Sequence, residues 1–207
     1  HQNTIEEAVK AYPDAKWRIV TIHQDIYGSG LDHSDTDGMI LRTQLTPVFD
    51  ANDIDVVLQG HDHTYSRSKL LYGDGQTHEG YEFSLNADGT DYDWDHATNI
   101  ETGEQITLNP EDGDEEAQAA LDAFHEDNQC YTIEDVEGNT VTDPQGTLYM
   151  TANSASGSKY YELVSTQQDY IAARSQNWLP SYSIITMDAE KFSIDTYQIT
   201  DNGTVEA

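Results

Sequence analysis

Two short apolar runs most constrain the fold of this chain, residues 17–22 (WRIVTI) and residues 54–58 (IDVVL). Both are rich in β-branched residues, and the second is the continuous apolar type that a buried parallel strand gives. Between them, apolar residues recur at helical spacing at Met39, Ile40, Leu41, Leu45, Val48 and Phe49. A short amphipathic helix precedes the first run, where Thr4 and Glu7 have capping-box spacing. The order helix, strand, helix, strand predicts an α/β layer with right-handed crossovers.

The rest of the chain divides into an insertion and a second part of the core. Residues 73–145 are dominated by Gly, Asp, Asn, Glu and Thr, and only residues 115–125 show helical periodicity. Strand-like sequence returns at residues 147–151, and residues 182–187 and 192–199 alternate as two strands of a hairpin. We therefore predict one domain over residues 1–207, with residues 1–72 and 146–207 as its fold core.

The charge balance argues against polyanionic partners. The chain has 9 Lys and Arg against 39 Asp and Glu, which gives a formal charge of −30. Such a surface repels nucleic acid and anionic membranes, and it suits a salty or extracellular setting. No apolar run approaches the roughly 18 residues of a membrane span, and Cys130 is the only cysteine, so no disulfide forms within the chain. A secreted or cell-surface location is expected.

Three histidines follow the two predicted strands. His23 ends the first, and His61 and His63 come directly after the second, beyond Gly60. The carboxyl ends of neighbouring strands in an open α/β sheet share one crevice, so these imidazoles are expected to converge there. Imidazole suits Zn, Fe and Mn, which predicts a transition-metal site. The alternative is a solvated loop that happens to carry a His-x-His pair.

The segment GHDHTYSR, preceded by VVLQ and further upstream by WRIVTIHQDIYGSG, resembles the last two metal-ligand motifs of calcineurin-like metallophosphoesterases. The resemblance is greatest to the purple acid phosphatase branch. The later segments YMTANSASGSKYY and YSIITMDAEKFSIDTYQI resemble the closing strands of bacterial members. The family resemblance covers residues 1 to about 72 and 146 to 200. It implies the C-terminal half of an α/β sandwich, with mixed sheets flanked by helices.

The resemblance also implies roles for particular residues. His23 and His61 would coordinate one metal and His63 the other, the pair being Fe, Zn or Mn. His33 matches a histidine that contacts the substrate phosphate or protonates the leaving group, although an exposed loop histidine is the alternative. In that family a hydroxide held between two metals attacks phosphorus in line. The implied activity is hydrolysis of a small-molecule or surface phosphate ester.

Other ligand motifs of that family have no match here. Its Asp-x-His and Gly-Asn-His motifs are absent, and Gly-Asp occurs only within the insertion. We therefore expect an incomplete site that binds one metal or none, and a missing N-terminal half of the same domain as partner. A sheet without its first strands exposes an apolar edge and face, so self-association of the isolated chain is expected.

Further residues around the histidines are candidates for support. Asp62 lies between the two predicted ligands and could orient an imidazole, and Tyr65 and Arg67 follow the loop and could pack and pair to hold it. Asp91, Asp93 and Asp95 alternate as in a calcium loop, but His96 stands where that loop needs Gly. Calcium is therefore not expected.

Two other classes of function remain open. One is a non-catalytic binding or structural module that keeps the scaffold of an enzyme. The other is a carbohydrate-binding module that uses the polar insertion together with an aromatic platform of Tyr160, Tyr161, Trp178 and Tyr182.

Overall fold

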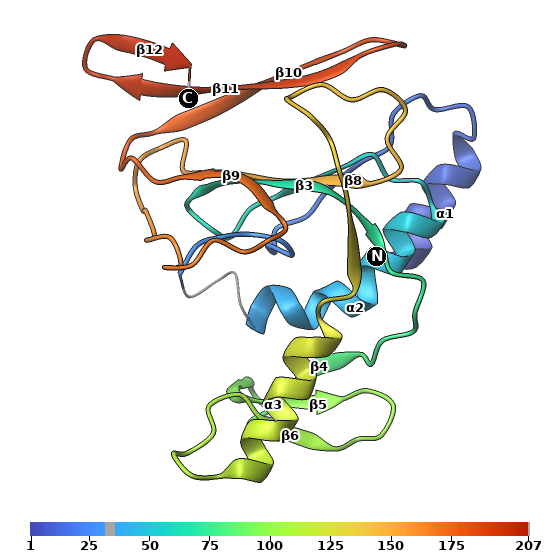
Figure 1. Cartoon of the computed structure of the whole chain (residues 1–207), viewed down its shortest axis with the longest axis vertical. Coiled ribbons are helices and arrows are strands. Elements are labelled where there is room, and N and C mark those ends of the chain that lie inside the picture. The colour runs from blue at the N-terminus through green and yellow to red at the C-terminus, as the bar shows by residue number, and fades with distance from the viewer. Residues whose placement is uncertain (32–35, 207) are drawn as a thin grey trace.

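The computed structural model describes residues 1–31 and 36–206. Its main sheet runs in the order β1 (Ile19–Thr21), β2 (Val56–Gln59), β8 (Thr147–Ala152), β3 (Tyr65–Gly73) and β7 (Tyr131–Glu134), with β9 (Ile171–Ser175) also paired to β3. β1, β2 and β8 are parallel, whereas β3 is antiparallel to β8, β7 and β9. The predicted parallel pair is confirmed, and the chain has a mixed α/β architecture (Figure 1).

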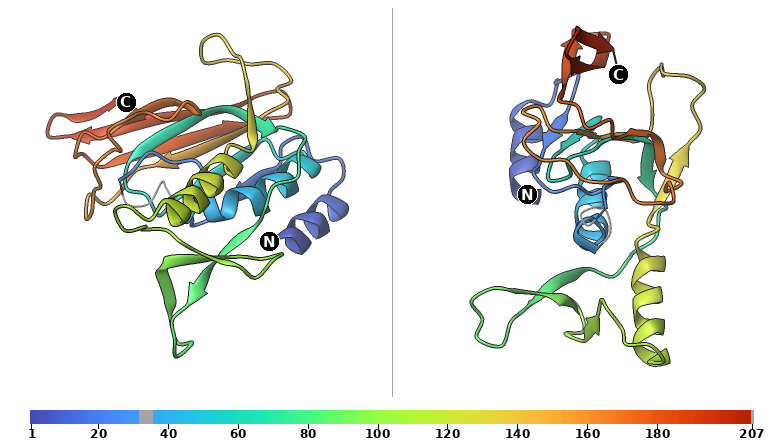
Figure 2. Two further views of the ribbon diagram at one scale, coloured as in Figure 1. Left: turned by 60° about the horizontal axis from the view of Figure 1, so that its bottom comes forward. Right: turned by 90° about the vertical axis from the view of Figure 1, so that its left-hand side faces the viewer.

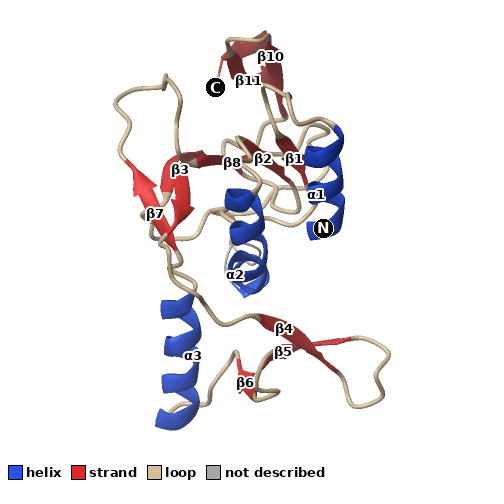
Figure 3. Cartoon of the chain, turned by 90° about the vertical axis from the view of Figure 1, so that its right-hand side faces the viewer, coloured by secondary structure: helices blue, strands red, loops and turns tan. Residues whose placement is uncertain are grey.

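Two helices accompany this sheet. α2 (Thr36–Ala51) lies on one side of it, and the three-stranded sheet of β10 (Ser181–Met187), β11 (Phe192–Thr200) and β12 (Gly203–Glu206) lies on the other (Figure 3). The predicted C-terminal hairpin is thus confirmed as β10 and β11, and β12 extends it. α1 (Gln2–Ala11) lies beside β1 and buries no residue completely.

Details of both helices differ from the expectations. α1 begins at Gln2 with His1 as its N-cap and no side-chain cap, so the capping box predicted from Thr4 and Glu7 is wrong, because the helix starts before Thr4. Pro47 lies within the apolar helical run of residues 39–49, where the sequence predicts a kink or a restart, but α2 continues through it as one helix. Phe49, beyond the proline, is buried in the core, and this packing favours continuation of the helix despite the lost backbone hydrogen bond.

The main core contains a cluster of tyrosines around a buried cation. The rings of Tyr149 and Tyr170 lie 4.7 Å and 5.1 Å from that of Tyr27. The Arg42 guanidinium is 4.7 Å above the Tyr27 ring, and its Nε donates to the Ile26 carbonyl at 2.6 Å. Buried charge is tolerated here because hydrogen bonds and ring faces replace water.

The insertion is folded and has a core of its own. It contains an antiparallel sheet of β4 (Tyr81–Leu85), β5 (Tyr92–Asn99) and β6 (Gln105–Thr107), and helix α3 (Glu115–Asp127), and it extends away from the main sheet (Figure 2). Phe124 and Leu121 of α3 are buried in this second core, and Ile40 of α2 joins it. The helix predicted at residues 115–125 is confirmed. β7 also lies within residues 73–145 but belongs to the main sheet.

In residues 1–31 and 36–206, no helix has the length and apolar character needed to cross a bilayer.

Candidate metal centre

Two of the predicted ligands meet at the carboxyl ends of β1 and β2. His23 follows β1 and His61 follows β2, and these strands pair in parallel from Ile19↔Val56 onward. The ring centroids of His23 and His61 lie 5.2 Å apart, with the ring planes at 71°. The imidazoles of His23 and His61 therefore lie side by side at the carboxyl ends of two neighbouring strands, as the sequence predicted.

The turn after β2 brings His61 there. The Gly60 amide donates to the His23 carbonyl at 3.1 Å, which joins the two strand ends one residue beyond the sheet. His61 then adopts φ 64°, a left-handed conformation that is uncommon for a residue with a side chain. Such strain persists only where the surroundings fix it, and it concentrates at functional sites.

His63 is held by a segment distant in sequence. Its Nδ1 lies 3.0 Å from the Lys159 carbonyl oxygen, and its ring centroid is 5.0 Å from that of Tyr161. Gln176 Nε2 donates to both the His63 and the Tyr161 carbonyls, at 2.8 Å and 2.7 Å. A carbonyl accepts only from a protonated nitrogen, so in the neutral ring Nε2 is the bare nitrogen. This is the arrangement that ligating histidines use.

The three supporting candidates lie in different surroundings. Asp62 is buried, and its Oδ2 accepts from the Gly30 amide at 2.6 Å, which ties the loop after β1 to the loop after β2. Tyr65 opens β3 opposite Ala152 of β8. Arg67 reaches the Asn139 side chain at 3.4 Å, in the loop after β7. His33, the predicted acid, lies outside the described residues.

A buried polar network holds the loop that follows His23. No sequence pattern predicted this network. Gln59 Oε1 accepts from the amides of Ile26 and Tyr27 at 2.8 Å and 3.1 Å. Its Nε2 donates to Asp25 Oδ1 at 2.8 Å, while the Thr151 hydroxyl donates to Asp25 Oδ2 at 2.8 Å. The ends of β2 and β8 thus both fix the loop that follows His23. The one sequence signal for this network is Gln59, a side-chain amide at the end of the apolar run of residues 54–58.

Burial governs the charge of this network. It raises the pKa of Asp25 well above the ordinary value, and the neighbouring Asp62 carboxylate adds to the effect. A protonated Asp25 can donate as well as accept, which suits its hydrogen bond with the Asp62 carboxylate.

The aromatic residues proposed as a sugar platform have different ring partners among the described residues. Tyr160 lies 6.0 Å from Trp178, whereas Tyr182 stacks on Tyr197 at 5.5 Å, and Tyr161 contacts His63. The acidic residues of β5 have partners within the insertion, since Asp93 Oδ2 lies 2.9 Å from His96 Nδ1.

Within the described part of the chain, no group of three or more His, Cys, Asp and Glu side chains is placed to hold a metal ion. Comparison with protein-family models and with curated proteins found no match for this chain.

Proposed function

We propose that this chain is the C-terminal part of a metallophosphoesterase catalytic domain, and that its intact parent hydrolyses phosphate esters. One observation carries the proposal: His23 and His61 stand 5.2 Å apart, centroid to centroid, at the ends of two adjacent parallel strands. An open α/β sheet binds its ligands at this edge.

The donor set suits a transition metal. His23 and His61 offer two imidazoles to one ion, and His63 presents Nε2 for a second because Lys159 accepts from Nδ1. When bound, such ions polarise phosphoryl oxygens and neutralise developing charge. The role of the chain is to fix the ligands: Asp62 and Gln59 hold the loops that carry them, so little reorganisation is needed on binding.

An apolar groove beside the site supports the idea of a missing half-domain. Its volume is about 740 Å³, and it is lined by α1, β1 and α2, with Ile5, Val20, Leu41 and Phe49 among its residues. Among the described residues β1 pairs with β2 alone, and all three residues of β1 line the groove. We propose that the N-terminal half of the same domain covers the groove, adds strands at β1 and supplies the remaining ligands.

The proposal is tested on the parent protein with a generic aryl phosphate as substrate. His61→Ala is expected to lower kcat/KM by more than about 100-fold, since loss of a mere supporting contact already costs 10–100-fold. His96→Ala is the matched control, because His96 lies in β5 of the insertion. An active His61→Ala variant, or a parent without metal-dependent hydrolysis, would refute the assignment.

The isolated chain tests the incomplete site separately. Titration with Zn²⁺ or Mn²⁺ should show one bound ion or none, because two neighbouring imidazoles are fewer protein ligands than a stable zinc site uses. In that state the chain behaves as a non-catalytic module. Binding of two ions with micromolar affinity would contradict the proposed incompleteness.

A further inference from the structure

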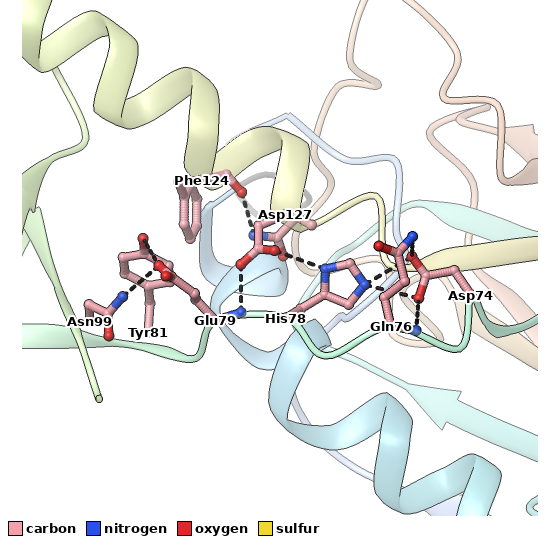
Figure 4. A network of polar contacts seen from close by, with 9 residues as sticks. Asp74, Gln76, His78, Glu79, Tyr81, Asn99, Phe124 and Asp127 are labelled. Carbon is pink, nitrogen blue, oxygen red and sulfur yellow. Dashed lines mark hydrogen bonds and ion pairs between the residues drawn. The ribbon is translucent and has the colours of Figure 1, made fainter. Parts of the chain in front are cut away.

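His78 joins the two places where the chain enters and leaves the insertion. The chain leaves β3 at Gly73 and returns from α3 at Asp127, and His78 lies between these crossings (Figure 4). Its Nδ1 is 2.8 Å from Asp127 Oδ1, and its Nε2 is 3.0 Å and 2.9 Å from the two oxygens of Asp74. All three side chains are largely buried, with exposed fractions of 15%, 18% and 24% for His78, Asp74 and Asp127.

This geometry specifies the protonation state of the ring. A neutral imidazole has one N–H donor, but here both ring nitrogens face carboxylate oxygens, which only accept when ionised. Only the imidazolium satisfies both contacts. On loss of one proton, a bare nitrogen would face a carboxylate at hydrogen-bond distance, and one of the two contacts would become repulsive.

Both carboxylates are anchored by backbone amides of one turn, residues 74–79. The Gln76 amide donates to Asp74 Oδ1 at 2.9 Å, and the Glu79 amide donates to Asp127 Oδ2 at 2.7 Å. His78 therefore closes this turn on itself through Asp74 and attaches it to the C-terminal end of α3 through Asp127. No rearrangement of the turn is needed for the ring to reach either partner.

Other charged groups near the turn have partners of their own. On α2, Asp50 accepts from the Gly73 amide at 2.6 Å. Glu79 accepts from the Tyr81 hydroxyl at 3.2 Å and from Asn99 of β5 at 2.7 Å. The charged groups that act on the imidazole are Asp74 of the turn and Asp127 of α3, and both favour its protonated form.

We propose that His78 is a pH-dependent clasp: as an imidazolium it ties Asp127 at the end of α3 to Asp74 in the turn of residues 74–79, and deprotonation removes that tie, which leaves the Glu79 amide as the remaining bond from the turn to Asp127.

The electrostatics agree with this geometry. Burial works against the imidazolium, but hydrogen bonds to Asp74 and Asp127 outweigh it, and the pKa of His78 is raised. A raised pKa in the folded state means that the clasp contributes fully below the ordinary histidine pKa, and that this contribution is lost as pH rises through the folded-state value.

Release affects one end of the insertion only. The Gln44 side chain of α2 donates to the Tyr81 carbonyl, and Ile40 of α2 is buried in the core of the insertion. These contacts carry no titratable group, so β4 stays attached to α2 at all pH values near neutrality. The clasp therefore controls how firmly α3 is held, while the sheet of the insertion keeps its place.

Hydrogen exchange of this chain, read by mass spectrometry from about pH 5 to about pH 8, tests the proposal. After correction for intrinsic rates, peptides over residues 74–81 and 121–130 should lose protection as pH rises. The expected loss is about tenfold for each unit by which the folded-state pKa exceeds the ordinary one. His78→Gln should show, across the whole range, the reduced protection that the wild type reaches at high pH, and peptides over residues 82–99 should not change.

His96→Gln is the matched control, because His96 meets a single carboxylate and its side chain is 38% exposed. It should keep the wild-type profile at the clasp. A wild type with no pH dependence there, or a His78→Gln variant that retains it, would overturn the proposal. A ring titration by nuclear magnetic resonance needs no variant to fold: a His78 pKa at or below 6.5 would overturn it equally.

Discussion

Replacing Gln59 by leucine tests how the loop after His23 is held. Gln59 is 7% exposed, and its Oε1 is the acceptor for the amides of Ile26 and Tyr27. Leucine has nearly the same volume but accepts nothing, so both amides would be left buried and unpaired. At about 1–3 kcal/mol for each orphaned group, the expected loss of unfolding free energy is about 2–6 kcal/mol.

Urea denaturation followed by near-ultraviolet circular dichroism measures this loss, because the buried tyrosines of the main core, Tyr27, Tyr149 and Tyr170, contribute to that signal only while they are packed. Gln44→Leu is the matched control. Gln44 donates to the carbonyls of Ile40 and Tyr81 from a partly buried position, so its loss orphans no amide and should cost only about 1 kcal/mol. Equal losses for the two variants would refute the reasoning.

Three further predictions concern other parts of the structure. Gly30→Ala places a Cβ on the Asp62 carboxylate and should cost about 1–3 kcal/mol by calorimetry. At Gly80 the added Cβ meets Ile100 Cδ1 at 3.3 Å and Gln44 Cγ at 3.7 Å, so Gly80→Ala should cost less than about 0.5 kcal/mol. Phe124→Ala should cost the insertion about 3–5 kcal/mol and expose residues 81–127 to hydrogen exchange without exposing the main sheet. The isolated chain should self-associate in sedimentation velocity through the apolar groove beside β1, and a monomeric wild type at high concentration would contradict this expectation.

Local sequence patterns predicted the helices and strands whose buried positions are apolar. β2 reads as a continuous apolar run and is buried in the sheet, and α3 has the periodicity that its buried Leu121 and Phe124 require. β3 was not predicted, because its buried positions include Ser66 and Ser68, which carry no apolar signal. Ser68 is buried because its hydroxyl accepts from the Tyr149 amide at 2.9 Å, a partner 81 residues away.

The same distinction applies to the candidate site. The approach of His23 and His61 could be predicted, because both follow strands that are adjacent and parallel. The contact between His63 and Lys159 could not, because it joins residues 96 positions apart through a loop without periodicity. The role of His78 was also hidden, since Asp127 comes from a helix 49 residues later.

The pairing of β3 with β7 has a consequence for the ancestry and engineering of this fold. Gly73 and Tyr131 are register partners, so residues 74–130 occupy the position of a hairpin loop. A two-residue turn is the usual connection at such a place. Because β3 and β7 already pair on either side, residues 74–130 can be gained, lost or moved to another hairpin without changing the strand order of the sheet.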